Sequence, residues 1–282
     1  MKLDITSSVL EKGIDLAKEF LGKLITPTVE ETGLLIKEKV TFWKFKHQIT
    51  ILNKAREHCL KHNISPKAIS LKLLCPLLDN AALEEDDFLQ DKWAILLSNM
   101  VDSSQNIENH VFPFLLSQIS KTEFLVLEKI FQLKQERVKK LMLELEKYNL
   151  EKSEEEDTLA EKVKSFVEAK DSYESRSKKW DLEKALREFR KDKVKILNNL
   201  KEPEFIPNAD LQEFELSNLI RLGIVKAIQQ HYAYANSTKI YNEPNADYLY
   251  LDDLEIEISD DGEIYAFSEL GELFLKACSE RK

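Results

Sequence analysis

Residues 83–101 read LEEDDFLQDKWAILLSNMV, and this stretch decides how the first part of the chain folds. Its apolar side chains recur at every third or fourth position, namely at Leu89, Trp93, Leu96 or Leu97, and Met100 or Val101. This spacing places them on one face of an α-helix, which buries that face. The four acids at 84–87 stand where the positive end of a helix dipole favours negative charge. We therefore predict an amphipathic helix that begins at these acids.

The composition of the chain indicates a mainly α protein. Its 282 residues suffice for one large domain or two smaller ones, and 33% of them are charged. Only six glycines occur, which disfavours both a Rossmann-type enzyme and an all-β architecture. Plentiful Leu, Glu and Lys are typical of long, solvent-facing helices. The net charge of −10 argues against a general nucleic-acid binder, which would carry an excess of basic residues.

The cysteines and the N-terminal residues predict a soluble, cytoplasmic protein. Cys59, Cys75 and Cys278 are an odd number without close spacing, which is typical of reduced, mostly buried thiols. The first sixteen residues mix acids into their apolar positions and do not form a signal peptide. The most apolar run, residues 71–78, is far shorter than the ~20 residues that cross a bilayer. We expect no stable membrane span.

We expect a helical N-terminal domain at residues 1–110. One amphipathic helix covers residues 1–25. A long helix follows, because Thr26-Pro27 is a favourable helix start and Thr28 with Glu31 is an alternative capping box. Its apolar pattern continues to about Leu60, and Asn63 ends it.

Two further signals complete this domain. Ser65-Pro66 predicts the start of another helix, and Cys75-Pro76 predicts a kink or a stop in it. We expect Asn80 to cap the acidic-start helix described above. A polar loop at 102–109 then separates this domain from the next.

The second domain, residues 111–282, is predicted to contain an inserted antiparallel coiled-coil hairpin at about 135–200. Its first helix begins at a capping box formed by Ser120 and Glu123. Apolar residues then alternate in steps of three and four, as in a coiled coil. These seam residues are Val138, Leu141, Leu145 and Tyr148, then Leu159, Val163 and Phe166, and in the second helix Leu182, Leu186, Phe189 and Leu197. We expect a break at 149–157, with Ser153 and Glu156 as a fresh cap, and an end at Pro203 and Pro207.

The remainder of this domain is predicted to be a winged-helix-like module with a small antiparallel β-hairpin. Its first helix is expected at 123–133, before the inserted hairpin, and a second near 210–222, where Gly223 permits the following turn. Apolar residues alternate at period two in Tyr248-Leu249-Tyr250 and at 254–258, and Asp260-Asp261-Gly262 predicts the hairpin turn. Ser268 is expected to cap the last helix.

The helix near 210–222 disfavours a nucleic-acid partner. It carries Asp210, Glu213 and Glu215 against Arg221 alone. Because attraction to phosphate is the sequence-independent part of DNA affinity, an acidic helix repels DNA. A transcription regulator nevertheless stays open as an alternative.

No pattern in the chain predicts a catalytic, cofactor or metal site. His58 and His62 lie one helical turn apart and could share a metal, but no third ligand stands out, so we interpret them as surface or half-buried histidines. Residues 42–47 (FWKFKH) could stack on bases, yet their helical spacing favours core packing. The acids at 84–87 and 154–157 are interpreted as helix starts or solvated faces. We find no phosphate-binding loop, dinucleotide fingerprint or nucleophile elbow, and we expect no enzyme.

Four segments resemble a known family. They are Pro27, Glu30 and Gly33 after the first helix; LEEDDFLQDKWAILL at 83–97; SKTEFLVLEKIF at 120–131; and NLIRLGIV at 218–225 with FSELGELFLKAC at 267–278. In their order and spacing the chain resembles the bacterial Abi-alpha (abortive infection alpha) family. The resemblance implies a role in phage defence, with Pro27, Gly33 and Trp93 as signature residues. It implies no catalytic residue.

The leading hypothesis is a non-enzymatic phage-defence protein that acts through protein–protein contacts. Its coiled-coil hairpin would bind a host or phage protein, or a second copy of the chain, because an exposed seam seeks another helix. A membrane-acting effector is an alternative, in which residues 13–36 insert into a bilayer. The charges at Glu19, Lys23 and Glu30 oppose it, at about 2.5–3.5 kcal/mol for each charge held mid-bilayer. A hidden enzyme ranks last, for want of a metal or phosphate motif.

Overall fold

The computed structural model of the chain describes residues 7–25, 42–104, 107, 109–167, 173–207, 210–236, 239–241, 250–252 and 255–280. The chain divides into two compact units. The base unit comprises Met1–Glu128 and Ile206–Lys282, and the hairpin unit comprises Lys129–Phe205. Helices make up most of both units, so the mainly α fold predicted from the sequence is confirmed.

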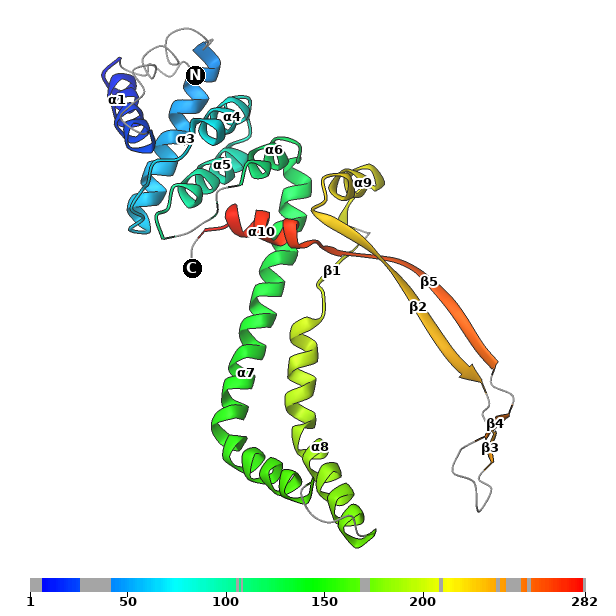
Figure 1. The fold of residues 1–282 in the computed structure, drawn as a ribbon. Helices are drawn as coiled ribbons and strands as arrows, with labels where there is room; N and C mark the ends of the chain where they lie inside the picture. The colour runs from blue at the N-terminus through cyan, green and yellow to red at the C-terminus, as the bar shows by residue number, and fades with distance from the viewer. Residues whose placement is uncertain are drawn as a thin grey trace. The chain divides into compact units, whose positions relative to one another are not determined.

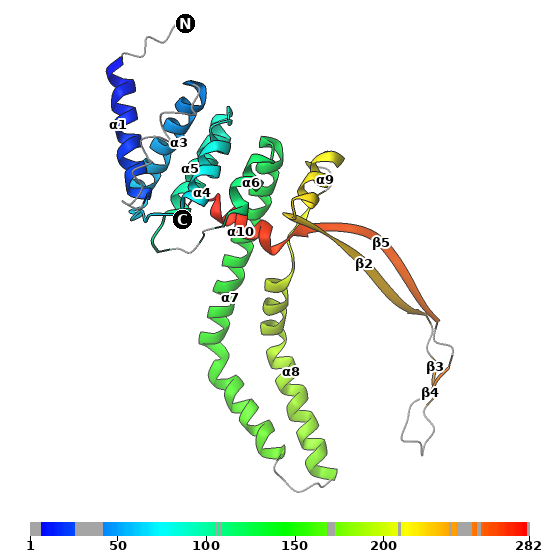
Figure 2. The ribbon, with the colours of Figure 1, turned by 45° about the horizontal axis from the view of Figure 1, so that its top comes forward.

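The first half of the base unit is a stack of helices (Figures 1 and 2). These are α1 (Ser7–Leu24), α3 (Phe42–Lys61), α4 (Leu71–Ala81), α5 (Asp87–Met100) and α6 (Val111–Ser117). Helix α3 packs against α1 and α5, and α4 packs against α6. Most of α5 is buried, and Trp93, Leu96 and Met100 are at most 1% exposed. Helix α5 therefore forms the centre of this core.

The acidic start of α5 is confirmed, but its cap is Asp86 and not Asn80. The Asp86 carboxylate accepts hydrogen bonds from the backbone N–H groups of Phe88 and Leu89, at 2.9 and 3.2 Å. It also accepts one from the Lys121 ammonium, and this bond is the main cause that lowers the pKa of Asp86. Asn80 lies inside α4 and has no part in capping α5.

The helix start expected at Ser65-Pro66 is wrong, and of the kink or stop expected at Cys75-Pro76 the stop is wrong. Ser65-Pro66 does not begin a helix, because Pro66 forms an isolated β-bridge with Asp102 and α4 begins at Leu71 after Ser70. Helix α4 also continues through Pro76 to Ala81. Proline there removes only the bond to the carbonyl of Lys72, one turn earlier, while the apolar face of the helix stays buried.

Other expectations for these helices are confirmed where the structure describes them. Helix α1 forms within residues 1–25 and buries Ala17, Phe20 and Leu24. Asn63 ends α3 in the left-handed conformation, with φ 52°. The helix start near Thr26-Pro27 and the other residues from 26 to 41 lie outside the described residues.

The second half of the base unit combines two long strands and three short ones with two helices. Its elements are β1 (Phe205–Ile206), α9 (Glu213–Arg221), β2 (Val225–Asn236), β3 (Lys239–Tyr241), β4 (Tyr250–Asp252), β5 (Glu255–Phe267) and α10 (Glu269–Ala277). One sheet has the strand order β1-β5-β2, and β3 pairs with β4 in a second. Strands β2 and β5 are antiparallel, with Val225 opposite Phe267 and Asn236 opposite Glu255. The helix expected near 210–222 and an antiparallel strand pair after it are thus present, while the winged-helix assignment stays a prediction.

The hairpin turn predicted at Asp260–Gly262 is wrong, because these residues lie inside β5. Gln229 pairs with Glu263 and His231 with Asp260, so one residue of β2 faces two residues of β5. Gly262 adopts φ +91°, as expected of a glycine at a β-bulge. The sequence Asp260-Asp261-Gly262 thus correctly indicates a position that requires glycine, but this position is an irregularity within a long strand and not a turn. Tyr248 and Leu249, which the alternation pattern included, lie outside the described residues.

Helix α10 closes the core of the base unit. Phe274 is fully buried, and its ring centre lies 6.0 Å from that of Phe112 and 6.3 Å from that of Phe124. The side chain of Asn99 donates hydrogen bonds to the carbonyl oxygens of Ala277 and Ser279, at 2.8 and 3.1 Å. Residues far apart in the sequence therefore hold the C-terminal end of α10 on α5.

The start of α10 is fixed by a close backbone contact. The Ser268 hydroxyl accepts a hydrogen bond from the N–H of Gly271, which confirms the predicted cap, and it donates one to the carbonyl of Gly223. A Cβ atom on Gly271 would lie 2.1 Å from the carbonyl oxygen of Ile224. Glycine at 271 thus allows the helix to approach the strand that begins at Val225.

A buried ion pair joins α5 to the first turns of α7 (Lys121–Val167). The Lys92 ammonium contacts the Glu128 carboxylate, and the two side chains are 10% and 17% exposed. The same ammonium lies 4.9 Å from the ring centre of Phe88 and 5.3 Å from that of Phe124. Ring faces and carboxylate together replace the water that the charge gives up on burial.

The hairpin unit consists of the rest of α7 and of α8 (Tyr173–Lys201), which run antiparallel (Figures 1 and 2). Ser120 and Glu123 form the predicted capping box at the start of α7. The break expected at 149–157 is wrong, because α7 is continuous through these residues. Helix α8 ends at Lys201, just before Pro203, as predicted.

Candidate functional site

The seam between α7 and α8 is only partly closed. On α7, Leu141 and Tyr148 are 8% and 6% exposed. On α8, the inward residues Leu182, Leu186, Phe189 and Ile196 are half-buried, and no residue from 177 to 201, where side chains are described, is fully buried. Leu197, which we expected in the seam, is 38% exposed, and Ile196 takes its place. A pair of helices alone does not exclude water from a coiled-coil seam, and this pair leaves apolar surface in contact with solvent.

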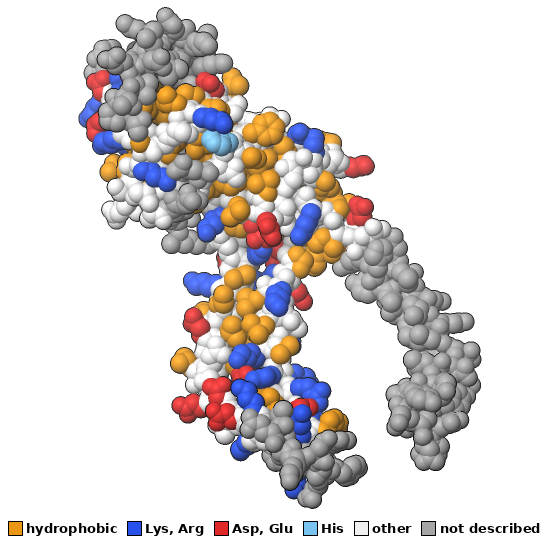
Figure 3. Space-filling model, viewed as in Figure 1, with side chains coloured by type: hydrophobic (Ala, Val, Ile, Leu, Met, Phe, Trp, Pro, Cys, Tyr) orange, Lys and Arg blue, Asp and Glu red, His pale blue; other side chains and the backbone are white. Residues whose placement is uncertain are grey.

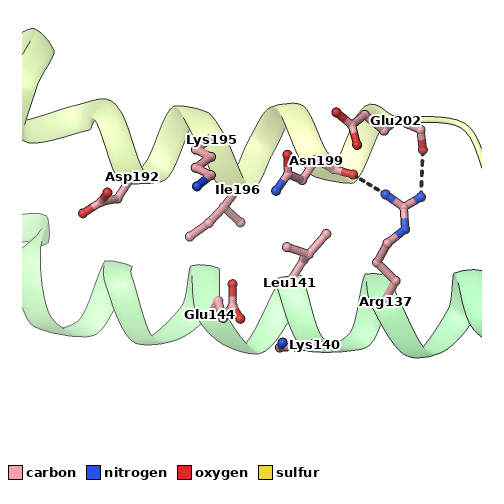
Figure 4. Close-up of a pocket in the computed structure, with 9 residues that line it drawn as sticks. All are labelled: Arg137, Lys140, Leu141, Glu144, Asp192, Lys195, Ile196, Asn199 and Glu202. Carbon is pink, nitrogen blue, oxygen red and sulfur yellow. Dashed lines mark hydrogen bonds between the residues drawn. The ribbon is translucent and has the colours of Figure 1, made fainter.

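Arg137 fixes the register of the two helices. Its guanidinium donates hydrogen bonds to the carbonyl oxygens of Asn199 and Glu202, each at 2.8 Å (Figure 4). Its Nε atom also lies 2.9 Å from the Glu204 carboxylate. These contacts satisfy carbonyls at the end of α8 that lack a partner within the helix. The C-terminal end of α8 is therefore tied to one position on α7.

A cavity of about 500 Å³ lies beside this contact. It is lined by Arg137, Lys140, Leu141 and Glu144 of α7 and by Asp192, Lys195, Ile196, Asn199 and Glu202. Leu141 and Ile196 point toward each other between the two helices, and charged side chains lie around them (Figure 4). Acids and bases occur in equal number, so the lining has no preference for phosphate. The lining contains no Ser, Thr, Cys, His or Tyr side chain.

A second polar cluster joins the middles of the two helices. The Glu156 carboxylate, on a residue 6% exposed, accepts hydrogen bonds from Arg190 at 2.7 Å and from Lys193 at 2.8 Å. The bond from Lys193 is the largest cause that lowers the pKa of Glu156, and burial opposes it. The Tyr148 hydroxyl donates to the carbonyl of Phe189 at 3.0 Å, and burial raises the pKa of Tyr148. These bonds hold α7 against α8 at the point where we expected α7 to break.

The face of the hairpin opposite the cavity carries exposed apolar side chains. Helical spacing places Lys140 and Glu144 on the cavity side of the seam, and Met142 on the other side. We name the apolar residues of that other side the apolar strip: Val138, Met142 and Leu145 of α7 with Val194 and Leu197 of α8. Met142 is 50% exposed, Val194 48% and Leu197 38%. A space-filling view shows hydrophobic side chains gathered over α7 and α8 on one face of the hairpin (Figure 3).

His58 and His62, which the sequence places one helical turn apart, lie side by side, but the described residues around them do not supply further metal ligands. The rings of His58 and His62 lie 4.4 Å apart between centres. Nδ1 of His58 lies 2.9 Å from the hydroxyl of Ser98, which in turn donates to the carbonyl of Ile95. Within the part of the chain that the structure describes, no three His, Cys, Asp or Glu residues could hold a metal ion.

The remaining sequence candidates have structural accounts or lie outside the description. The side chains of residues 42–45 are not among those described, although their backbone belongs to α3. Glu215 of α9 accepts a hydrogen bond from the N–H of Gln212 and so caps its own helix. Among the described residues, no helix combines the length and the apolar character needed to cross a membrane.

Sequence reasoning missed the residues that hold the hairpin together, above all Arg137, Glu156 and Lys193. One signal was available for two of them. Lys193 follows Phe189 at a spacing of four, and Glu156 follows Tyr148 at a spacing of eight, so both continue the seam as charged residues of opposite sign. Charged residues in a seam position indicate a buried ion pair across two helices.

Comparison with known proteins gives one match. Residues 44–278 match a family model described as "Abortive infection alpha", and this range includes α4 to α10 and the whole hairpin unit. No curated protein and no solved structure matches the chain. The match covers most of the chain and includes the segments from 83 to 278 on which the resemblance rested.

Proposed function

The chain belongs to the abortive infection alpha family, and from this premise we propose that it defends a bacterial host against phage by abortive infection, acting without catalysis through protein–protein contacts of the hairpin unit. The three cysteines are free, which supports a reducing compartment and hence the cytoplasm as its place of action.

The observation that carries the contact mechanism is the half-open seam of the hairpin with its apolar strip. Apolar surface that α7 and α8 leave exposed is favourably removed from water by another protein surface. The ion pairs of Arg137 and Glu156 meanwhile keep the two helices in register, so this surface exists before any partner arrives. A preformed surface loses less conformational entropy on binding than a flexible one.

The two alternatives have less support. A transcription regulator would present a basic helix to DNA, whereas the first turn of α9 carries Glu213 and Glu215. A membrane-acting effector would depend on residues 13–36, and α1 already uses its apolar face, including Phe20 and Leu24, in the core of the base unit.

The first experiment tests the defence function itself. Bacteria that express the intact chain are challenged with a panel of phages at low and at high multiplicity, and culture lysis and plaque counts are followed. We expect protection at low multiplicity and early collapse of the culture at high multiplicity. Equal plaque counts with and without the protein, for every phage in the panel, would contradict the proposal.

The second experiment tests the hairpin unit as the contact surface. Residues 135–200 are replaced by a short flexible linker, and the variant is compared with the intact chain in the same assay. We expect protection to be lost while circular dichroism still reports cooperative unfolding of the base unit. Unchanged protection would move the contact surface to the base unit and leave the defence function standing.

A further inference from the structure

We propose that the apolar strip is covered by the apolar strip of a second copy of this chain, in a dimer whose two-fold axis runs along the hairpins. The inference rests on the proposed function, in which the hairpin unit is the contact surface, and it names the partner. Two antiparallel hairpins packed in this way form a four-helix bundle, which is a common solution for helix pairs that cannot bury their own seam.

The position of the strip fits a bundle. Its residues adjoin the seam on one side only, so a second hairpin would close the seam from that side and leave the cavity side open. Met142 of α7 and Val194 of α8 flank the seam and are about half exposed. Val138 and Leu145, nearer the seam, are half-buried. Exposure thus increases from the seam outward across the strip, as expected of a surface whose covering helices are missing.

The charges beside the strip complement each other across a two-fold axis. On α8, Arg187 and Lys191 follow at the outer edge of the strip, and on α7 the outer edge carries Glu146. All three side chains are exposed. Lys191 has a contact with Glu188 at 3.7 Å, and both of its members are solvated, so this pair contributes little. At this level of the hairpin the outer edge of α7 therefore carries one acid, seven residues after the exposed Lys139, and that of α8 carries two cations.

The register within one hairpin places these charges at the same level. Tyr148 bonds to Phe189, and Leu141 and Ile196 face each other in the cavity, so Glu146 and Lys191 lie at matching heights on the two helices. A two-fold axis along the hairpins sets α7 of one copy on α8 of the other at equal height. Glu146 of each copy then meets Lys191 and Arg187 of the other, and the contact forms twice.

The test is the oligomeric state of the full chain with reversed charges. Sedimentation equilibrium is measured over a concentration series for the wild type, for Glu146→Lys, for Lys191→Glu and for the double variant. We expect a wild-type dimer, a dissociation constant raised about tenfold by each single reversal, and recovery in the double variant. Because these side chains are exposed, the reversals leave the fold intact, and circular dichroism checks this.

A matched control reverses two exposed charges on the cavity side of the same hairpin, Glu144→Lys and Lys195→Glu, and should leave the dimer unchanged. A second variant, Met142→Lys, places a charge in the strip itself and should give a monomer. A wild-type chain that stays monomeric up to about 100 µM overturns the inference. So does a dimer that tolerates both single reversals or is not restored by the double variant.

The phage challenge separates this inference from the proposed function. A monomeric chain that still protects cells would leave the defence function standing and assign the strip to a host or phage protein. A dimer that gives no protection would keep the assembly and remove the function.

Discussion

At the scale of single residues, Gly271 illustrates how closely backbone segments pack in the base unit. A methyl group at this position would meet the carbonyl oxygen of Ile224 at 2.1 Å, and a backbone atom cannot move aside as a flexible side chain can. We expect Gly271→Ala to lower the free energy of unfolding by about 1–3 kcal/mol, since α10 must shift away from the strand. Urea unfolding followed by circular dichroism measures this change.

The control for that prediction is the same substitution at an open site. Gly22 lies on the exposed side of α1, and a Cβ atom there would meet nothing within 4 Å. Gly22→Ala should therefore raise stability by about 0.5–1 kcal/mol through its better helix propensity. Equal effects of the two substitutions would show that the contact with Ile224 is not tight in solution.

The buried pair of Lys92 and Glu128 gives a second prediction at this scale. Lys92→Met should cost about 3–5 kcal/mol, because it leaves the Glu128 carboxylate buried without its partner. Adding Glu128→Leu should recover most of the loss, since an apolar pair suits the surrounding Phe88 and Phe124 rings. Lys121→Met is the control, because its ion pair with Asp86 is solvent-exposed and its loss should have a much smaller effect. Additive losses in the double variant would contradict this account.

At the scale of helices and strands, local signals predicted the starts of α7 and α10 but not the start of α4, and they failed where packing decides continuity. The capping box of Ser120 and Glu123 and the cap at Ser268 need only neighbouring residues, so the sequence contains the whole cause. The continuity of α7 through 149–157 depends instead on Arg190 and Lys193, which lie more than thirty residues away. The bulge at Gly262 likewise requires the pairing of β5 with β2, which no local pattern reveals.

For the candidate site, too, the sequence predicted the elements but not the surface that they form together. The period of apolar residues predicted a helical hairpin, and the hairpin is present. The apolar strip was not predictable, because it depends on which sides of two helices face the same way, and this follows from the register that Arg137 and Tyr148 set.

Glu156 gives a prediction for the hairpin as an element. Its pKa in the folded state is below the ordinary value of 4.5, so its contribution to stability is present above that pH and is lost as the pH falls through the folded pKa. At pH 7, Glu156→Gln should lower the free energy of opening that hydrogen exchange reports for residues 129–205 by about 1–3 kcal/mol. Exchange measured by mass spectrometry, corrected for intrinsic rates, reports this change.

A comparison with Glu155, an exposed neighbour, shows whether the effect of Glu156→Gln on hydrogen exchange comes from its buried ion pairs. Glu155→Gln removes the same charge from a side chain exposed to solvent, and it should leave hairpin exchange nearly unchanged. The difference between the two variants should shrink when the pH falls well below 4.5, because Glu156 is then protonated in the wild type as well. A difference that persists at low pH would assign the effect to packing and not to charge.

At the scale of the whole molecule, the charge is unevenly divided along the sequence. Residues 129–205 hold twenty Lys and Arg against eighteen Asp and Glu, so the acidic excess of the chain belongs to the base unit. A strongly acidic unit repels the phosphate backbone at any sequence. We expect no binding of labelled duplex DNA at about 50 mM salt by fluorescence anisotropy. Binding that weakens steeply between about 50 and 200 mM salt would instead revive the transcription-regulator alternative.

Because α10 is made last, the core of the base unit is completed only at the end of synthesis. Phe274 fills the space between Phe112 and Phe124, and Asn99 holds the carbonyls that follow it, yet the ribosome makes the whole hairpin and the strands between these partners. At about 5–20 residues per second, roughly eight to thirty seconds separate Phe124 from Phe274. During that interval the nascent base unit exposes an unfilled core, while the partners of Arg137 and Glu156 that hold the two helices of the hairpin together have already been made. The newly made chain thus has a completed hairpin before it has a completed base.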